Sequence, residues 1–233
     1  MATLLDTSWA ALMLLISGDS GLWQIVGVSF SVSTIALLLV TVPALLIGFA
    51  LAYLSIPGRW LWLSCFNTLQ SVPTVVIGLL LYMLLSRSGP LGDWRLLFTQ
   101  KAMVLGQMLI AFPVIVTMAH AAFSQSDRRA WETALTLGVP WPKALLGLMR
   151  ECRFGLLAAI IGAFSRIITE VGCSMMVGGN MLHFTRNIPT AIALETQKGA
   201  FTQGVALGMV LLSLALLLNL LLTASRGYSY LKN

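Results

Sequence analysis

The chain has 233 residues, of which 9% are charged and 58% are hydrophobic, and its mean hydropathy is +0.90. A soluble domain carries about 25% charged residues, so the composition excludes an ordinary soluble protein and predicts an integral membrane protein. The net charge of +6 does not indicate a nucleic-acid partner, because membrane proteins concentrate basic residues in their cytoplasmic loops.

The first 20 residues are expected to form an interfacial segment. Their apolar run, 8–16, is too short to cross about 30 Å of hydrocarbon and is expected to lie along one membrane face. Residues 1–21 contain no Lys or Arg, which argues against a secretory signal. We interpret residues 21–233 as one all-α transmembrane domain.

Five spans are expected in this domain, because long uncharged runs exceed the roughly 20 residues that a crossing helix needs. The first span is expected to bend or tilt near Pro43. The fourth contains Arg166 and Glu170. In chain order, the five spans are expected at about 22–54, 60–85, 102–123, 154–177 and 201–224.

The positive-inside rule predicts the orientation. With the N-terminus outside, the inner loops and the C-terminal tail hold eight Lys and Arg residues, whereas the outer loops hold five. This places the C-terminus and the charged segment 126–153 in the cytoplasm.

Segment 126–153 is predicted to fold as an elbow of two helices. Ser126 or Asp127 is expected to cap the first helix, whose first turn contains Glu132. Gly138 is expected to end it in the left-handed conformation, and a second helix is expected to begin near Pro142. The apolar side of the elbow is expected to consist of Ala134, Leu135, Leu137, Leu145 and Leu146.

The elbow resembles a cytoplasmic loop of ABC-type importer permeases. Glu132, Ala134 and Gly138 match the E-A-A-x-x-x-G pattern of that loop, although Thr133 replaces its first alanine. The stretches 86–107, 149–172 and 170–201 are similar, in that order, to permeases of tungstate-type uptake systems. The resemblance therefore covers most of the chain from residue 22 onwards.

The resemblance implies a type I importer permease in a bacterial inner membrane, working as a homodimer. Two cytoplasmic ATPase subunits would bind ATP and Mg²⁺. This chain itself is expected to hold no cofactor and not to be an enzyme. A solute-binding protein outside would deliver an oxyanion, with tungstate the first expectation and molybdate, sulfate or another small solute the alternatives. Glu132, Ala134, Gly138 and Trp141 are expected to couple the permease to the ATPase, although Trp141 also suits a membrane-interface belt.

Polar residues within the spans are the pathway or gate candidates. Arg166 and Glu170 are expected to face the bundle interior, because a charge at the bilayer centre costs at least about 2.5 kcal/mol. They either pair with each other or supply the potential that an oxyanion meets. Gln70 and Thr74 beside Pro73 either join helices or line a polar cavity, and Asn180 lies in an expected flexible outer mouth.

Other chemistry is not expected. His120 and His183 lack a metal-ligand partner at helical spacing, and the three cysteines lack zinc or redox spacing. The alternative from another class is a polytopic scaffold or a respiratory-complex subunit, which would be expected to show haem-ligating histidines or a proton chain within its spans.

Overall fold

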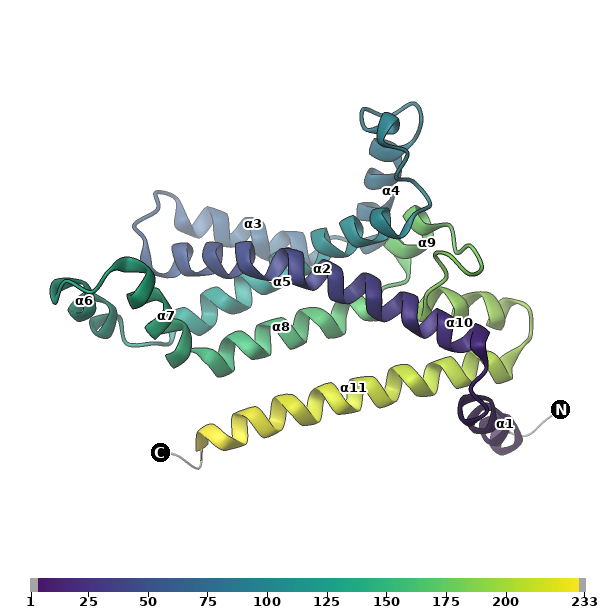
Figure 1. The fold of residues 1–233 in the computed structure, drawn as a ribbon. Helices are drawn as coiled ribbons and strands as arrows, with labels where there is room; N and C mark the ends of the chain where they lie inside the picture. The colour runs from purple at the N-terminus through teal and green to yellow at the C-terminus, as the bar shows by residue number, and fades with distance from the viewer. Residues whose placement is uncertain (1–3, 231–233) are drawn as a thin grey trace.

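Four long helices lie alongside one another in the computed structural model, which describes residues 4–230. They are α2 (Ser20–Tyr53), α5 (Gln100–Ser124), α8 (Arg153–Ile168) and α11 (Phe201–Tyr230) (Figure 1). The shorter elements are α1 (Leu4–Ile16), α3 (Arg59–Ser71), α4 (Thr74–Leu85), the 3₁₀ turn η1 (Gly92–Trp94), α6 (Arg128–Thr136), α7 (Trp141–Glu151), α9 (Gly172–Gly178) and α10 (Ile188–Gln197).

The predicted spans agree with these helices in number. Within the described residues, α2, α5 and the first 18 residues of α11 are each long and apolar enough to cross a bilayer. Two bent pairs, α3 with α4 and α8 with α9, bring the number to five if each pair is one span. The all-α expectation is confirmed for residues 4–230, whereas the ends of the expected domains, 1–3 and 231–233, lie outside the described residues.

The second and fourth expected spans are not straight, and the structure corrects them. The axes of α3 and α4 differ by 93°, and those of α8 and α9 differ by 59°. Pro73 has no N–H to donate and forces the residue before it into an extended conformation, which Val72 adopts with φ −64° and ψ 129°. In contrast, α2 continues through Pro43 without a break.

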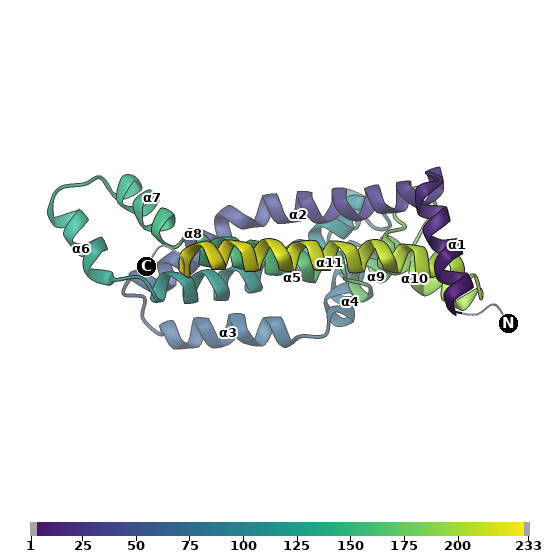
Figure 2. The same cartoon turned by 90° about the horizontal axis from the view of Figure 1, so that it is seen from below.

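The core lies mainly between α2 and α5, which pack closely along their length. At Gly48 a Cβ atom would lie 2.8 Å from the Cβ of Ala119, so only glycine allows this approach. Small residues let membrane helices pack by close van der Waals contact. Figure 2 shows α11 running lengthwise along the bundle, with α1 turned across its end.

Candidate functional site

The elbow forms at residues 126–153 much as the sequence predicts. The Asp127 side chain accepts a hydrogen bond from the N–H of Arg129, so Asp127 rather than Ser126 caps α6. Ser126 instead donates to Glu151 across the base of the elbow at 2.8 Å. Glu132 is the fifth residue of α6, so the expectation that it lies in the first turn is wrong.

The turn between α6 and α7 is a Schellman motif built on Gly138. The N–H of Val139 donates to the carbonyl of Ala134, and the N–H of Gly138 donates to that of Leu135, both at 3.0 Å. This pattern needs a left-handed residue, and Gly138 has φ +77°. No atom lies within 4 Å of the position that its Cβ would take. The glycine is therefore required for its backbone angle and not for space.

An aromatic cluster joins the elbow to the bundle. The Trp131 ring of α6 lies 5.0 Å from that of Phe49 and 5.6 Å from that of Tyr53, both on α2. Phe123 of α5 packs edge-on against Phe49 at 5.7 Å, and Trp141 packs against the same ring at 6.2 Å. We call these five residues the aromatic cluster. Edge-to-face pairs add about 0.5–1.5 kcal/mol each to apolar burial, so the cluster ties α6 and α7 to the ends of two spans.

The expected coupling residues occupy different positions on the elbow. Glu132 is exposed and pairs with Arg128 one helical turn earlier, at 3.2 Å. Ala134 is partly buried against the core. Trp141 is 48% exposed, so about half of its surface remains available to a partner or to the membrane interface.

The expected apolar side of the elbow is only partly buried. Leu145 is buried, but Leu135, Leu137 and Leu146 are exposed, Leu137 by 77%. The expected apolar side is therefore not one buried face, because Leu137 follows the last turn of α6 and is exposed. Trp131, which the sequence analysis did not single out, is the buried residue of α6.

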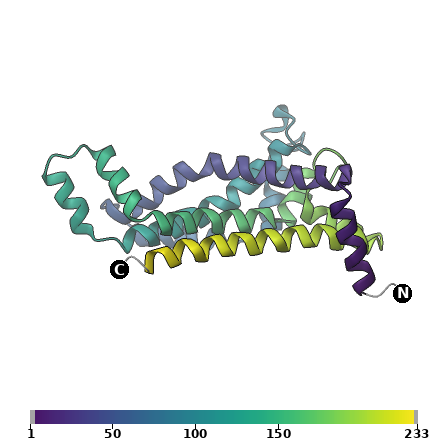
Figure 3. The ribbon, with the colours of Figure 1, turned by 60° about the horizontal axis from the view of Figure 1, so that its bottom comes forward.

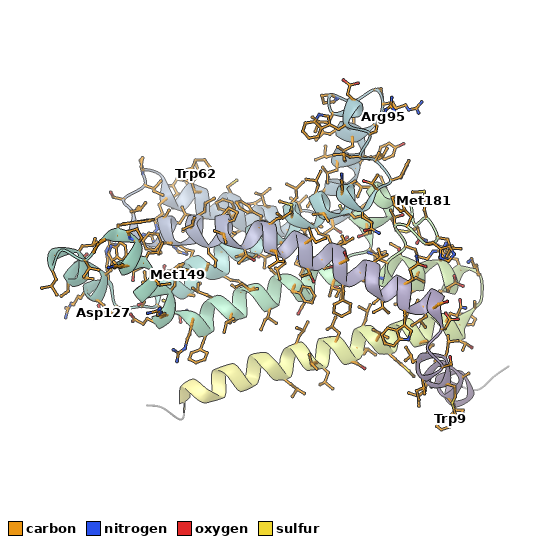
Figure 4. The ribbon with its side chains drawn as sticks, in the orientation of Figure 1. Trp9, Trp62, Arg95, Asp127, Met149 and Met181 are labelled. Carbon is orange, nitrogen blue, oxygen red and sulfur yellow. The ribbon has the colours of Figure 1, made fainter. Side chains whose placement is uncertain are left out.

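The elbow lies beyond the end of the bundle (Figures 2 and 3). The start of α3 and the end of α11 lie at this same end, whereas α1 and α10 lie at the other. In Figure 4, Asp127 and Met149 mark the elbow, and Trp62 lies on α3 near it. Cys152 is buried where α7 meets α8, and this burial raises the pKa of its thiol.

The pathway candidates Arg166 and Glu170 do not pair with each other. Glu170 lies beyond the last residue of α8, Ile168, so the two side chains no longer share a helical face. Glu170 is buried and accepts a hydrogen bond from the N–H of Cys173 at 3.0 Å. Arg166 is exposed and donates to the carbonyl of Gln70 at 3.3 Å. The expectation that both face the bundle interior is thus wrong for Arg166 in the single chain.

The other pathway candidates lie near the helix breaks. The Gln70 amide donates to the Thr117 hydroxyl at 2.8 Å and so joins α3 to α5. Thr74 begins α4, and a Cβ at Gly172 would lie 3.2 Å from its hydroxyl oxygen. The two breaks therefore lie together. The third candidate, Asn180, has φ +49° and donates to the carbonyl of Thr190 at 3.4 Å.

Within the described residues, no cluster of His, Cys, Asp and Glu could hold a metal ion. His120 instead contacts Arg59, with 3.1 Å between its Nε2 and the guanidinium. His183 bonds to Gln24 at 2.7 Å. Both histidines thus have protein partners.

Comparison with known proteins identifies the family to which this chain belongs. Residues 44–229 match the family model described as "Binding-protein-dependent transport system inner membrane component". The chain belongs to this family. It is therefore a multi-pass inner membrane permease subunit, and membership implies an ATPase and a substrate-binding protein as partners. The family also rules out the alternative of a respiratory subunit.

Three relatives are similar over much of the chain. A "Probable anion ABC transporter permease protein" of Haloferax volcanii is 38% identical over 203 residues, covering 85% of this chain and 88% of the relative. The tungstate uptake system permease protein TupB of Campylobacter jejuni is 41% identical, over 66% of this chain and 64% of the relative. TupB of Peptoclostridium acidaminophilum is 32% identical, over 90% and 92%. Permeases named for sulfate and molybdenum transport are less similar, at 25–28% identity.

Proposed function

We propose that this permease carries an oxyanion, and that the oxyanion is tungstate. The observation that carries the proposal is the pair of relatives named as tungstate uptake permeases, at 41% and 32% identity, the second over 90% of this chain. Molybdate and sulfate remain the alternatives, and the lower identity to permeases named for them, 27% and 25–28%, favours tungstate.

The proposed assembly contains two copies of this chain, two ATPase subunits that bind ATP and Mg²⁺, and a solute-binding protein outside. The elbow, the start of α3 and the C-terminus face the cytoplasm, and the N-terminus faces outward. The basic residues support this orientation under the positive-inside rule. Six of them lie at the start of α3, on the elbow or at the start of α8: Arg59, Arg128, Arg129, Lys143, Arg150 and Arg153.

In this assembly the elbow transmits force. Leu137 and Trp141 present exposed apolar surface beyond the bundle, and such residues are typical anchors of protein interfaces. When the ATPase subunits close on ATP, they move the elbow, and the aromatic cluster passes the motion to α2 and α5. Rigid-body rotation of packed helices is an established form of such switching.

Arg166 is the proposed oxyanion contact along the pathway. Among the described residues of α2, α3, α4, α5, α8 and α9, it is the one Lys or Arg that lies beyond the first two residues of its helix, in the last turn of α8. Its bond to a neutral carbonyl at 3.3 Å is long. A charged oxyanion forms a shorter and stronger bond with a guanidinium, so it can displace Gln70 and leave again.

Uptake by the reconstituted complex tests the cargo. Proteoliposomes containing this chain and its ATPase, with ATP enclosed in the lumen and with the binding protein and tungstate outside, should import tungstate. Excess unlabelled tungstate should compete more strongly than molybdate or sulfate. Import of molybdate or sulfate in preference to tungstate would overturn the cargo assignment. Absence of ATP-dependent import of all three oxyanions would overturn the oxyanion proposal.

Glu132→Ala tests the coupling role. We expect weaker ATPase association or hydrolysis without uptake, because an acidic group at the docking surface is lost. The matched control is Glu151→Ala, which removes the carboxylate at the base of the elbow that accepts from Ser126. Transport and hydrolysis equal to those of the wild type in Glu132→Ala would remove Glu132 from the proposed docking surface.

A further inference from the structure

A cavity of about 120 Å³ lies at the end of the molecule opposite the elbow. It forms where α1, the start of α2, the loop 179–187, α10 and α11 meet, and much of its wall is apolar. Three charged side chains also line it: Asp19, Arg186 and Glu195. Figure 4 places Met181 on the loop and Trp9 on α1 at this end. The pathway candidates at the helix breaks, Gln70, Thr74, Arg166 and Glu170, do not line this cavity. The one link to the pathway candidates is the loop 179–187, which carries Asn180 as well as Arg186.

Arg186 brings unused hydrogen-bond donors to this cavity. Its Nε atom is buried and has no partner among the described residues. One terminal nitrogen reaches the carbonyl of Asn180 only at 3.5 Å, which is the outer limit of a hydrogen bond. A buried guanidinium nitrogen without an acceptor is costly. The site therefore suits a ligand that presents acceptor oxygens, ideally with negative charge.

Two carboxylates restrict the charge of that ligand. Glu195 is 8% exposed, and one of its oxygens pairs with Lys198 at 3.0 Å. One oxygen of Asp19 accepts from the N–H of Leu22 at 2.8 Å and caps α2. A simple anion would be repelled by these carboxylates, and a simple cation would be repelled by Arg186. A ligand with both a phosphate and an ammonium group satisfies all three side chains.

The loop that carries Arg186 is held in place before any ligand binds. The Thr185 hydroxyl donates to the carbonyl of Gly178 at 2.6 Å, and Asn187 caps α10 in a reciprocal capping box. The N–H of Ile188 donates to the Ser29 hydroxyl of α2 at 2.6 Å. The loop is thus tied to its neighbours. A preorganised loop loses little entropy when it binds a ligand.

The surroundings of the cavity match the headgroup depth of a membrane. Trp9 is 62% exposed and Trp23 is 49% exposed at this end, and exposed tryptophans are typical of the membrane–water interface. Leucine and isoleucine side chains from α1, α2 and α11 form the apolar wall, which suits the glycerol and upper acyl region of a lipid.

We propose that this cavity binds the headgroup of an amine-bearing phospholipid, with its phosphate at Arg186 and its ammonium at Asp19 and Glu195. The same phosphate and ammonium could also come from a soluble phosphorylated amine, but the apolar wall favours the lipid. The site rests on its own geometry and holds for any cargo that the permease carries.

Native mass spectrometry of the purified, delipidated full-length complex tests this proposal. The probes are phosphatidylethanolamine, phosphatidylcholine, whose ammonium has no N–H, and phosphatidylglycerol, which has no ammonium. The wild type should bind phosphatidylethanolamine about tenfold more tightly than phosphatidylglycerol, the size of one charge-assisted hydrogen bond. Phosphatidylcholine should fall between them. Equal binding of all three lipids by the wild type would overturn the proposal.

Variants locate the site. Arg186→Gln should weaken phosphatidylethanolamine binding about tenfold, whereas Lys101→Gln, which removes an exposed cation at the start of α5, should leave it unchanged. Asp19→Asn keeps an oxygen to cap α2 and should mainly reduce the preference for phosphatidylethanolamine over phosphatidylglycerol. If Arg186→Gln does not fold, Asp19→Asn and the wild-type preference decide the result.

Two further results would refute the assignment. Wild-type binding in both Arg186→Gln and Asp19→Asn would show that the lipid binds elsewhere. Displacement of the lipid by an equal concentration of soluble phosphoethanolamine would show that the free zwitterion, and not a lipid, is the ligand.

Discussion

Replacing Trp131 with alanine removes a buried ring that holds the elbow against the bundle. The side chain is 8% exposed and packs against Phe49 and Tyr53. Truncation of a buried Trp to Ala costs about 3–5 kcal/mol. At 1.4 kcal/mol for each factor of ten, local opening of α6 should become more frequent by roughly two to three and a half orders of magnitude.

Hydrogen exchange of the purified complex measures this opening, because amide protection reports local unfolding. We expect the amides of α6 and α7 in Trp131→Ala to lose protection while those of α2 and α5 keep it. In proteoliposomes, the number of oxyanions imported per ATP hydrolysed should fall, since a loosened elbow no longer moves the spans with the motor.

Trp141→Ala is the matched comparison. Trp141 is 48% exposed and packs against Phe49 alone of the aromatic cluster, at 6.2 Å, so its loss should cost the elbow only about 1 kcal/mol. Its main expected effect is weaker ATPase association. The reasoning fails if Trp131→Ala leaves α6 protection at the wild-type level, or if Trp141→Ala loosens α6 more than Trp131→Ala does.

Three further results are expected. A cysteine at Lys143 should react with an impermeant maleimide only from the cytoplasmic face and one at Gln197 only from the outer face; labelling of both from one face would contradict the orientation. Gly138→Ala should destabilise the elbow by about 1–2 kcal/mol, because alanine is strained at positive φ. Gly147→Ala, in the interior of α7, should instead stabilise the elbow by about 1 kcal/mol. Thermal unfolding that gives the two changes in stability the same sign would refute the Schellman turn. Burial raises the pKa of the Cys152 thiol. With the other two cysteines replaced by alanine, alkylation of Cys152 should therefore be slow at pH 7 and should accelerate only at a higher pH than alkylation of a free thiol does. Equal pH profiles for Cys152 and a free thiol would contradict its burial.

Hydropathy and end signals predicted much of this fold. The third span was expected at 102–123 and forms at Gln100–Ser124, and the turn at Gly138 has the expected conformation. These features depend on a few adjacent residues, such as a glycine after the last helical turn. Local sequence therefore suffices to find them.

The helix breaks and the aromatic cluster depend on tertiary contacts and were missed. Pro43, Pro73 and Pro113 all lie in apolar runs, but only the break at Pro73 redirects the chain. Pro43 and Pro113 lie within helices that pack closely on each other, whereas α4 turns away to pack on α9. Similarly, the pairing of Arg166 with Glu170 assumed an unbroken helix, and the helix ends between them.

The length of α2 has a consequence for the membrane around the transporter. At 1.5 Å per residue, its 34 residues extend about 51 Å, and even a 40° tilt, the upper end of the usual range, leaves about 39 Å along the bilayer normal. This exceeds the roughly 30 Å of hydrocarbon, so α2 emerges into the headgroups by about 9 Å in total. Phe49 and Tyr53 lie on its last turns, and a thicker bilayer would draw them toward the acyl chains. The chain length of the lipids should therefore change how strongly movement of the ATPase subunits is coupled to movement of the transmembrane helices.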